Sequence, residues 1–437
     1  MIYKGSEHEK DWKNTTEGEP EMNTLTRIFA IVVLLCLIGV AAAANGLSAA
    51  RAVGMGGAHM GLAKGVYAPL YNPANIGLSE YRETGLEVAG VGVQISNNSY
   101  TLEDYNKYTG AVLSEDDKSV ILGKIPREGL KITAEAEVGA MSFSMGSMVL
   151  SINGVAATEV NLGKDALELF LEGNDLNESF SLDGMYSEAI AYASVGLSYG
   201  MPIYVSGTRQ LAVGATVKYL QGFAYEEVTE IHGGVVTLAT GFAGEGTMIA
   251  RTAMGGSGYG LDIGATLKLN DSYTAGVSFS NVLSHITWNN QTEEHGYHFE
   301  LDTLNIDVMD DDSIDASDDW SEPIDDFSSS LPTVMKAGLA NIDGRFLWAV
   351  DYIQGFKLAA GSSSKPRVAA GVEYRLLNSM PLRAGYSLGG GKGSVVSGGI
   401  GFNMSLFHID IALSNSSTFD LDSTKGLHLA FSTGLRF

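Results

Sequence analysis

Two serines of the chain lie in the pattern that α/β-hydrolases use for their nucleophile. The pattern G-x-S-x-G surrounds Ser198 and, further along, Ser387. A nucleophilic serine of this kind needs a strand, a sharp turn and then a helix to present its hydroxyl group. Both patterns instead end a stretch with strand-like alternation, and no helical periodicity follows either of them. We therefore predict that neither serine is a nucleophile.

The other residues that could perform chemistry do not form a catalytic or metal-binding constellation. The eight histidines are scattered, and the metalloprotease pattern H-E-x-x-H is absent. The glycine clusters lack the strand–loop–helix context of a phosphate cradle. His408 and His428 could lie close to Asp410 and Arg436, a group that we interpret as a paired polar network rather than a catalytic triad. We predict no enzyme activity, no cofactor and no metal site.

The N-terminal region has the composition of a secretion signal. Residues 22–44 begin with a short polar stretch, continue with an apolar stretch and end in small residues at Ala44. This is the order of a signal peptide, and the apolar stretch is shorter than the roughly 20 residues of a membrane helix. We expect cleavage before Asn45, and we interpret residues 1–21 as an upstream, non-native extension. Because the only cysteine, Cys36, lies in the signal peptide, the mature chain has no thiol chemistry.

The composition excludes nucleic acid as a partner and directs attention to strands. The chain carries a formal net charge of −24 at pH 7, and such an acidic chain repels a polyanion. It has 54 glycines, and 45% of its residues are hydrophobic. After residue 44, no stretch is long and apolar enough for a membrane helix. The apolar residues are instead arranged with the two-residue period of β-strands.

This alternation has the polarity of a membrane barrel. In the last ten residues, Leu429 to Phe437 place apolar side chains on one face, and His428 to Arg436 place small or polar ones on the other. The polar face mixes small residues with charges of both signs, which suits a crowded lumen better than a solvated surface. The chain ends on an aromatic residue, Phe437, as outer-membrane barrels commonly do for their assembly machinery. We therefore predict an all-β fold, a transmembrane antiparallel barrel with its apolar face towards lipid.

About 17 stretches carry the alternation, and we predict that about 14 of them span the membrane. The weakest candidates lie in 233–254 and 298–306. Along one strong candidate, Ile263 is expected to face lipid and Gly264 the lumen, where serine is tolerated if there is room. Short polar turns are expected on the periplasmic side. Long loops are expected on the outer side, at 97–131, 162–186 and 289–331.

Two of the long loops are expected to contain helices. Ser114 precedes three acidic residues, which is the arrangement of an N-cap with acids in the first helical turn. Lys164 to Glu172 carries five apolar residues, too many for a free surface helix. Two interpretations remain open. The helices close the barrel mouth and bury their apolar faces on each other, or they form an external apolar groove that captures a hydrophobic ligand.

The third long loop is strongly acidic. Its residues 302–326 include eleven Asp or Glu and no base. We expect a solvated, self-repelling loop. Binding of a divalent cation is the alternative, although the spacing does not fit an EF-hand.

The segment from Ala50 to Leu78 differs from the rest of the chain. It is rich in glycine, has Arg51 and Lys64 as its only full charges, and is too poor in large side chains to build its own core. Glycine lets backbone approach other backbone closely or adopt a positive φ. We therefore predict that residues 45–80 form a hatch inside a barrel built by residues 81–437.

A turn is expected near the middle of this hatch. Pro73 lacks an N–H group and biases Asn72 towards an extended conformation, so the dipeptide predicts a turn. The amide of Asn72 is expected to bind backbone or wall groups that water cannot reach.

The segment ARAVGMGGAHMGLAKGVYAPLYNPANIGL resembles the N-terminal signature of FadL-like outer-membrane proteins, the long-chain fatty-acid transporter family. The wider superfamily includes the barrel of the type IX secretion shuttle. The C-terminal phrases VAAGVEYRLLNSMPLRAGYSLGG and FSTGLRF are also similar to the family. The resemblance implies a 14-stranded barrel with an internal hatch. Its gate residues are then Arg51, Gly54, Gly56, Gly57, Tyr71, Asn72, Pro73 and Ala74.

These observations leave three functions open. The first is passive uptake of a hydrophobic small molecule, such as a fatty acid, across the outer membrane of a Gram-negative (diderm) bacterium. The others are a docking or shuttle barrel for secreted cargo and a structural barrel. Expected partners are outer-membrane lipid, the barrel assembly machinery and the hydrophobic molecule. A hydrophobic channel in the lumen favours uptake, whereas a filled lumen beneath an ordered loop platform favours docking.

Overall fold

The structure is a computed structural model of the chain. It describes residues 46–173, 175–239, 241–304, 316–377, 379–416 and 421–437, all of which belong to one compact unit. The predicted signal peptide and the upstream extension lie outside the described residues.

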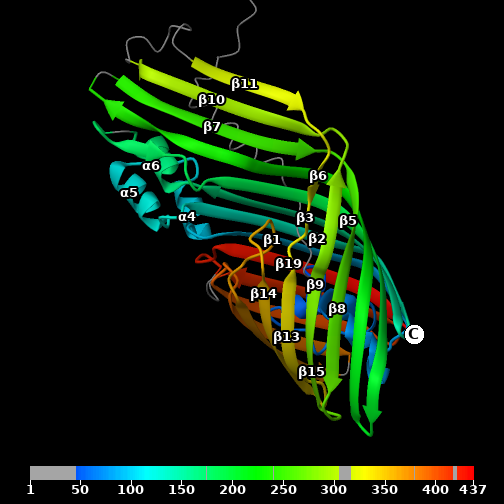
Figure 1. The fold of residues 1–437 in the computed structure, drawn as a ribbon. Helices are drawn as coiled ribbons and strands as arrows, with labels where there is room; N and C mark the ends of the chain where they lie inside the picture. Colours follow the sequence, from blue (N-terminus) through cyan, green and yellow to red (C-terminus); the bar gives the residue numbers. More distant parts are fainter. Residues whose placement is uncertain (1–45, 174, 240, 305–315, 378, 417–420) are drawn as a thin grey trace, which may run out of the picture. The chain divides into compact units, whose positions relative to one another are not determined.

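Fourteen strands pair in sequence into a closed antiparallel ring (Figure 1). The last strand, β19, pairs with both β18 and β1, so the ring has no open edge. The strand number and the barrel class predicted from the alternation are therefore confirmed. The ring strands are β1 (Gly85–Asn97), β2 (Leu130–Met145), β3 (Met148–Leu162), β5 (Tyr186–Ser206), β6 (Arg209–Leu238), β8 (Gly256–Lys268), β9 (Tyr273–Trp288), β13 (Val334–Asn341), β14 (Phe346–Gly355), β15 (Arg367–Leu377), β16 (Met380–Gly389), β17 (Ser394–Met404), β18 (Phe407–Ser416) and β19 (Gly426–Arg436).

The two faces of the ring have the predicted polarity. On β19, Phe431 is 39% exposed, whereas its neighbour Ser432 is 1% exposed. On β8, Ile263 is exposed and Asp262 is buried. Large apolar side chains thus cover the outside of the ring, and small or charged ones fill the inside, which is the arrangement of a transmembrane barrel.

The connections between ring strands differ in length at the two ends of the barrel. At one end, which we call the turn end, β2 and β3 are joined through Gly146-Ser147, and β5 and β6 through Gly207-Thr208. At the other end, the loop end, β1 and β2 are separated by 98–129, and β3 and β5 by 163–185. This is the alternation of short and long connections that the sequence predicted.

The weakest predicted strands extend the sheet of the ring beyond the barrel, and we call this extension the second sheet (Figure 1). β6 is 30 residues long and pairs first with β5 and β8 in the ring, and then, from Tyr225, with β7. β7 in turn pairs with β10, and β10 with β11. The added strands are β7 (Gly241–Ala253), β10 (Glu293–Leu304) and β11 (Ala316–Pro323), with short β4 (Ser179–Ser181) on β6 and β12 (Phe327–Ser329) on β9.

Within the long loop expected at 289–331, the weak strand candidate at 298–306 corresponds to β10. The expectation of a loop was wrong over β11 and β12, which were not predicted. The physical reason is that the β10–β11 hairpin pairs its backbone groups along the edge of β7, which repeats the alternation of the ring. The most acidic part of the run, 305–315, lies outside the described residues. Among the described residues, no group of three or more His, Cys, Asp or Glu could hold a metal ion.

The two predicted helices are present at the loop end. α5 (Glu115–Lys124) begins after Ser114, whose Oγ accepts a hydrogen bond from the Asp117 N–H in a capping box. α6 (Lys164–Glu172) has the predicted bounds. Leu167 and Leu171 of α6 pack with Leu122 of α5, so the helices bury apolar side chains on each other, as the first interpretation predicts.

A third helix, α4 (Leu102–Tyr108), was not predicted from the sequence. Its capping box consists of Thr101 and Asp104, and this three-residue spacing was the available signal. None of the described helices is both long and apolar enough to span a membrane.

Replacing Ile263 by arginine tests the facing of the wall. We expect Ile263→Arg to destabilise the folded barrel by roughly 2–4 kcal/mol, because a charge near the bilayer midplane loses its hydration. The measurement is urea-induced unfolding in lipid vesicles, followed by the heat-modifiable gel shift. Ile231→Arg, on the part of β6 that pairs with β7 beyond the ring, is the matched control. An equal loss at Ile231 would contradict the assignment of faces.

Candidate functional site

The chain before β1 lies inside the ring (Figure 1). We call residues 46–84 the hatch segment. Most of its residues are buried, and its polar groups bond to inward-facing residues of the ring strands. Its short helices are α2 (Ala50–Val53), η1 (Gly65–Tyr67), α3 (Ala68–Tyr71), η2 (Pro73–Gly77) and η3 (Ser79–Tyr81).

The first part of the hatch segment packs against glycines of the barrel wall. Met55 is fully buried and lies against Gly371 and Gly385, which pair directly across β15 and β16. A Cβ on either wall glycine would overlap the hatch backbone or Met55. Gly56 and Gly57 then turn the chain with φ of 70° and 88°, values that favour glycine. Gly54 similarly lies against the wall glycine Gly399.

The predicted turn at Asn72-Pro73 is confirmed, and it packs against a second pair of wall glycines. Asn72 is fully buried, its Oδ1 accepts a hydrogen bond from the Ala74 N–H at 3.0 Å, and its Nδ2 donates to the Ala265 carbonyl at 3.0 Å. The turn and Ala74 lie against Gly214 and Gly264, which are direct neighbours on β6 and β8. Serine was expected at position 264 only if the lumen had room, and it has none there, because a Cβ would overlap Asn72 Oδ1.

A chain of alternating charges ties the hatch segment to the wall. Arg51 donates to Glu373 through Nε at 2.8 Å and Nη2 at 3.1 Å. Glu373 also accepts from Arg383 at 2.8 Å, and Arg383 donates to Asp410 at 2.7 Å. Burial lowers the pKa of Arg51, but the Glu373 carboxylate more than offsets this effect, so the pKa lies above its ordinary value. Arg51 is therefore a fully charged anchor.

Wall carboxylates also hold the hatch backbone. Asp351 Oδ2 accepts the N–H groups of His59 and Met60 at 2.7 and 2.8 Å. Glu137 accepts the Leu47 N–H at 2.6 Å and the Ser48 hydroxyl at 3.0 Å. Sequence reasoning missed both carboxylates as hatch anchors. The available signal was a lone acid on the lumen face of a predicted strand.

His59 and Tyr71 form an aromatic contact in the interior of the hatch segment. Their rings meet edge to face with centroids 5.2 Å apart. Burial and the nearby Arg51 charge lower the pKa of His59 well below its ordinary value, so the imidazole is neutral at pH 7. The Tyr71 hydroxyl donates to the Gly46 carbonyl at 3.2 Å.

The hatch segment separates two cavities. The outer cavity, of about 160 Å³, reaches the loop end, where Asn98 and Gly390 line it. The inner cavity, of about 110 Å³, reaches the turn end at Ile342 and Arg436. The hatch residues lining the outer cavity include Val53 and Gly57 and Tyr71, and those lining the inner cavity include Arg51, His59 and Tyr67. No hatch residue lines both, so the segment lies between the two spaces.

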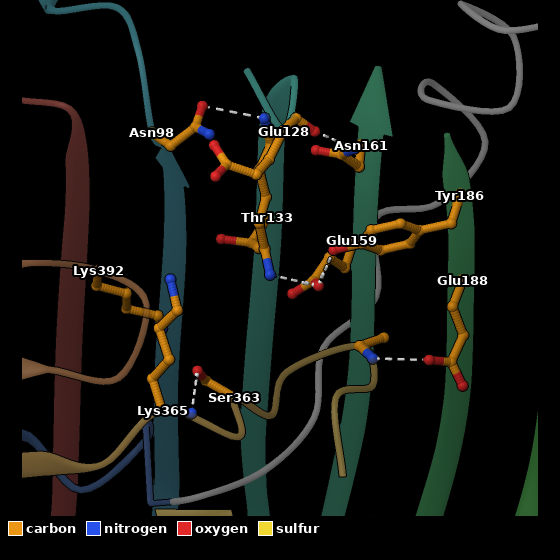
Figure 2. Close-up of polar contacts among 12 residues, drawn as sticks. Asn98, Glu128, Thr133, Glu159, Asn161, Tyr186, Glu188, Ser363, Lys365 and Lys392 are labelled. Carbon is orange, nitrogen blue, oxygen red and sulfur yellow. Dashed lines mark hydrogen bonds and ion pairs between the residues drawn. The ribbon is translucent and has the colours of Figure 1, made fainter. Parts of the chain in front are cut away.

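Ion pairs line the outer cavity. Lys131 Nζ lies 2.5 Å from Glu159 Oε1, and Lys392 Nζ lies 2.7 Å from Glu135 Oε1. Figure 2 shows Lys392 and Lys365 extending from the loop-end connections towards the strands of the wall. The cavity is therefore more polar than the hydrophobic channel that would favour uptake of an apolar molecule most directly.

The predicted group of His408, His428, Asp410 and Arg436 forms only in part: His408, Asp410 and Arg436 lie close together, but His428 does not join them. His408 on β18 lies opposite Gly434 on β19, and His428 on β19 lies opposite Ser414 on β18. The two histidines are therefore six residues apart along the strand pair, which is roughly 20 Å. They contact different parts of the hatch segment: His408 Nε2 lies 3.3 Å from the Tyr67 hydroxyl, and His428 Nε2 lies 3.2 Å from the Leu47 carbonyl. Both histidines face the lumen as predicted, but their positions along the strands separate the two imidazole groups.

Neither G-x-S-x-G serine lies at a strand-to-helix turn. Ser198 lies within β5, where its hydroxyl shares a 2.8 Å hydrogen bond with Thr216. Ser387 lies within β16 and faces the outer cavity. The terminal Phe437 is exposed at the turn end, and its N–H donates to the Thr84 carbonyl at 2.9 Å.

Comparison with known families assigns the chain. A model described as a family of unknown function, DUF5723, matches residues 73–252 and 241–412, which together cover well over half of the sequence. The chain belongs to this family. The DUF5723 match begins at Pro73 of the hatch turn and continues through most of the ring. No curated protein matches the chain.

Solved structures show the same fold. The toluene transporter TbuX of Ralstonia pickettii is 14% identical, with a TM-score of 0.51 over 89% of this chain and 98% of that one. A deltaS2S3 mutant of TodX, described as a monoaromatic hydrocarbon channel, is 13% identical, with a TM-score of 0.51 over 91% and 98%; TodX itself is from Pseudomonas putida. The FadL-like barrel predicted for this DUF5723 member is thereby confirmed as a fold.

Proposed function

We propose that the protein is a hatch-gated barrel of a Gram-negative outer membrane that takes up a small hydrophobic molecule. The observation that carries the proposal is the position of the hatch segment between the outer and inner cavities. A ligand that enters at the loop end meets the hatch before it can reach the turn end. The apolar outer face of the ring supports residence in a membrane.

The size of the outer cavity favours a compact ligand. At about 160 Å³ it is comparable to a cavity of about 150 Å³ that holds one benzene molecule. A fatty acid, the example expected from the sequence, would need the hatch segment to move before its chain could fit. The two similar structures are a toluene transporter and a monoaromatic hydrocarbon channel, which supports a one-ring or short-chain molecule as the cargo.

Uptake into whole cells tests the proposal. We expect a Gram-negative host that lacks its own channels of this fold to accumulate radiolabelled toluene faster when it displays the protein. Cells displaying no added barrel provide the background, because lipopolysaccharide slows the entry of apolar molecules. Equal rates with and without the protein, for both toluene and oleate, would overturn the uptake function.

Docking of secreted cargo is a second candidate, and the second sheet is the observation that favours it. Within the described chain, β11 pairs only with β10, so its outer edge is open to a further strand. Shortening β7, β10 and β11 distinguishes the candidates. Toluene uptake should persist if the lumen is the functional part, whereas cargo binding should be lost if the sheet is.

A further inference from the structure

The outer cavity is positively charged although the chain as a whole is acidic. Five cations line it, Lys131, Lys336, Lys365, Arg367 and Lys392, against two carboxylates, Glu135 and Glu159. The chain carries a formal net charge of −24. A local excess of cations in so acidic a chain calls for a separate explanation.

Direct ion pairs inside the protein account for two of the five cations. The two carboxylates are already bound by Lys131 and Lys392. Lys336 is buried, and its Nζ donates to the Leu70 carbonyl of the hatch segment at 2.9 Å. Lys365 lies exposed at the rim. The remaining cation, Arg367, makes no direct hydrogen bond or ion pair through its guanidinium with any described residue, and the charges of Glu135 and Asp351 act on it only at longer range.

Arg367 faces the hatch segment at one of its glycines. A Cβ on Gly57 would lie 3.0 Å from Arg367 Nη2, so the absence of a side chain there leaves room at the guanidinium. A Cβ on Gly390 would likewise approach the aliphatic stem of Arg367. The two glycines thus leave room around Arg367, which lines the cavity. A planar guanidinium fits a carboxylate through two parallel hydrogen bonds.

Two buried hydroxyl groups in the same cavity also lack partners. Ser387 is 1% exposed and Ser362 is 8% exposed, and neither Oγ has a hydrogen-bond partner among the described residues. Ser387 pairs with Ala369, two residues beyond Arg367, so Ser387 and Arg367 share the inner face of adjacent strands as diagonal neighbours. Buried hydroxyl groups in native proteins are normally hydrogen-bonded. Each hydroxyl group is therefore a free donor for an acceptor that enters the cavity.

From this arrangement we infer that the outer cavity binds the carboxylate group of a compact organic acid, with Arg367 as the anchor and Ser387 and Ser362 as additional donors. The inference rests on the proposed function insofar as this acid is the cargo of the same lumen. A neutral hydrocarbon would leave the guanidinium and both hydroxyl groups unpaired. A single guanidinium deep in the site matches a singly charged group better than a dianion such as phosphate.

Calorimetric titration of the purified barrel in a non-ionic detergent tests the inference, with benzoate, toluene and inorganic phosphate as probes. Benzoate and toluene have nearly the same shape and differ in charge. We expect wild-type protein to bind benzoate more tightly than either toluene or phosphate. Arg367→Gln should weaken benzoate binding by roughly ten- to a hundredfold, and Ser387→Ala by a smaller factor. Arg209→Gln removes a charge from the exposed first residue of β6 and is the matched control.

The heat-modifiable gel shift shows whether each variant is folded, and toluene binding unchanged by Arg367→Gln shows that its lumen is intact. Equal binding of benzoate and toluene by wild type, or unchanged benzoate binding in folded Arg367→Gln, would overturn the anion site. Phosphate bound as tightly as benzoate would overturn the choice of a carboxylate. Toluene entry into cells without benzoate binding would leave the uptake function standing and reject this inference alone.

Discussion

Replacing Arg51 by alanine is expected to release the first part of the hatch segment while the ring stays folded. Arg51 supplies one of the three guanidinium groups that pair with Glu373; Arg375 lies 3.6 Å from the carboxylate, and Arg383 is shared between Glu373 and Asp410. Without Arg51, the two buried carboxylates are left with Arg383 and the more distant, exposed Arg375. Breaking a buried ion pair by removing one partner typically costs about 3–5 kcal/mol, and we expect the lower end because Arg383 remains.

Hydrogen exchange followed by mass spectrometry measures this release. Amides of residues 46–60 should exchange faster in Arg51→Ala, with little change in β15 and β16. Arg51→Lys should be intermediate, since lysine keeps the charge but loses the two-pronged geometry. Arg209→Ala at the turn end is the control. Unchanged exchange in Arg51→Ala would show that the ion pair does not hold the segment.

The ring and the hatch turn could be predicted because their determinants are local. Alternation around Ile263 and along Leu429 to Phe437 specifies which face meets lipid, whatever the neighbouring strands are. Asn72-Pro73 specifies a turn through its own backbone preferences. These features need only neighbouring residues in the sequence, and the structure contains them as expected.

The hatch contacts and the outer cavity depend instead on ring closure and register. Arg51 and Glu373, or Lys131 and Arg367, are far apart in sequence and come together only when the strands pair in one register. The same reason explains why His408 and His428 do not lie together. Their lumen-facing orientation was predicted correctly, but their positions along the strand pair were not. The close contact between Gly264 and Asn72 likewise depends on where the hatch turn lies.

Deleting Ala50–Ile76 is expected to open the barrel. The deletion removes the residues that separate the outer and inner cavities. It also removes Met55 and the Asn72-Pro73 turn, which pack against wall glycines. The wall carboxylates Asp351 and Glu373 would lose their hatch partners, but water that fills the emptied lumen can hydrate them. The 14 strands would still close through the β1–β19 pairing, so the ring should fold.

Single-channel conductance of this deletion in planar bilayers tests the central claim, that the hatch segment closes the lumen. We expect steady conductance roughly tenfold or more above wild type, because a barrel of this size without a plug approaches the aqueous channels of 16–18-stranded porins. Arg51→Ala should open briefly, with a mean conductance between those of wild type and the deletion. If the deletion gives the folded gel shift and conducts no more than wild type, the hatch segment is not the gate.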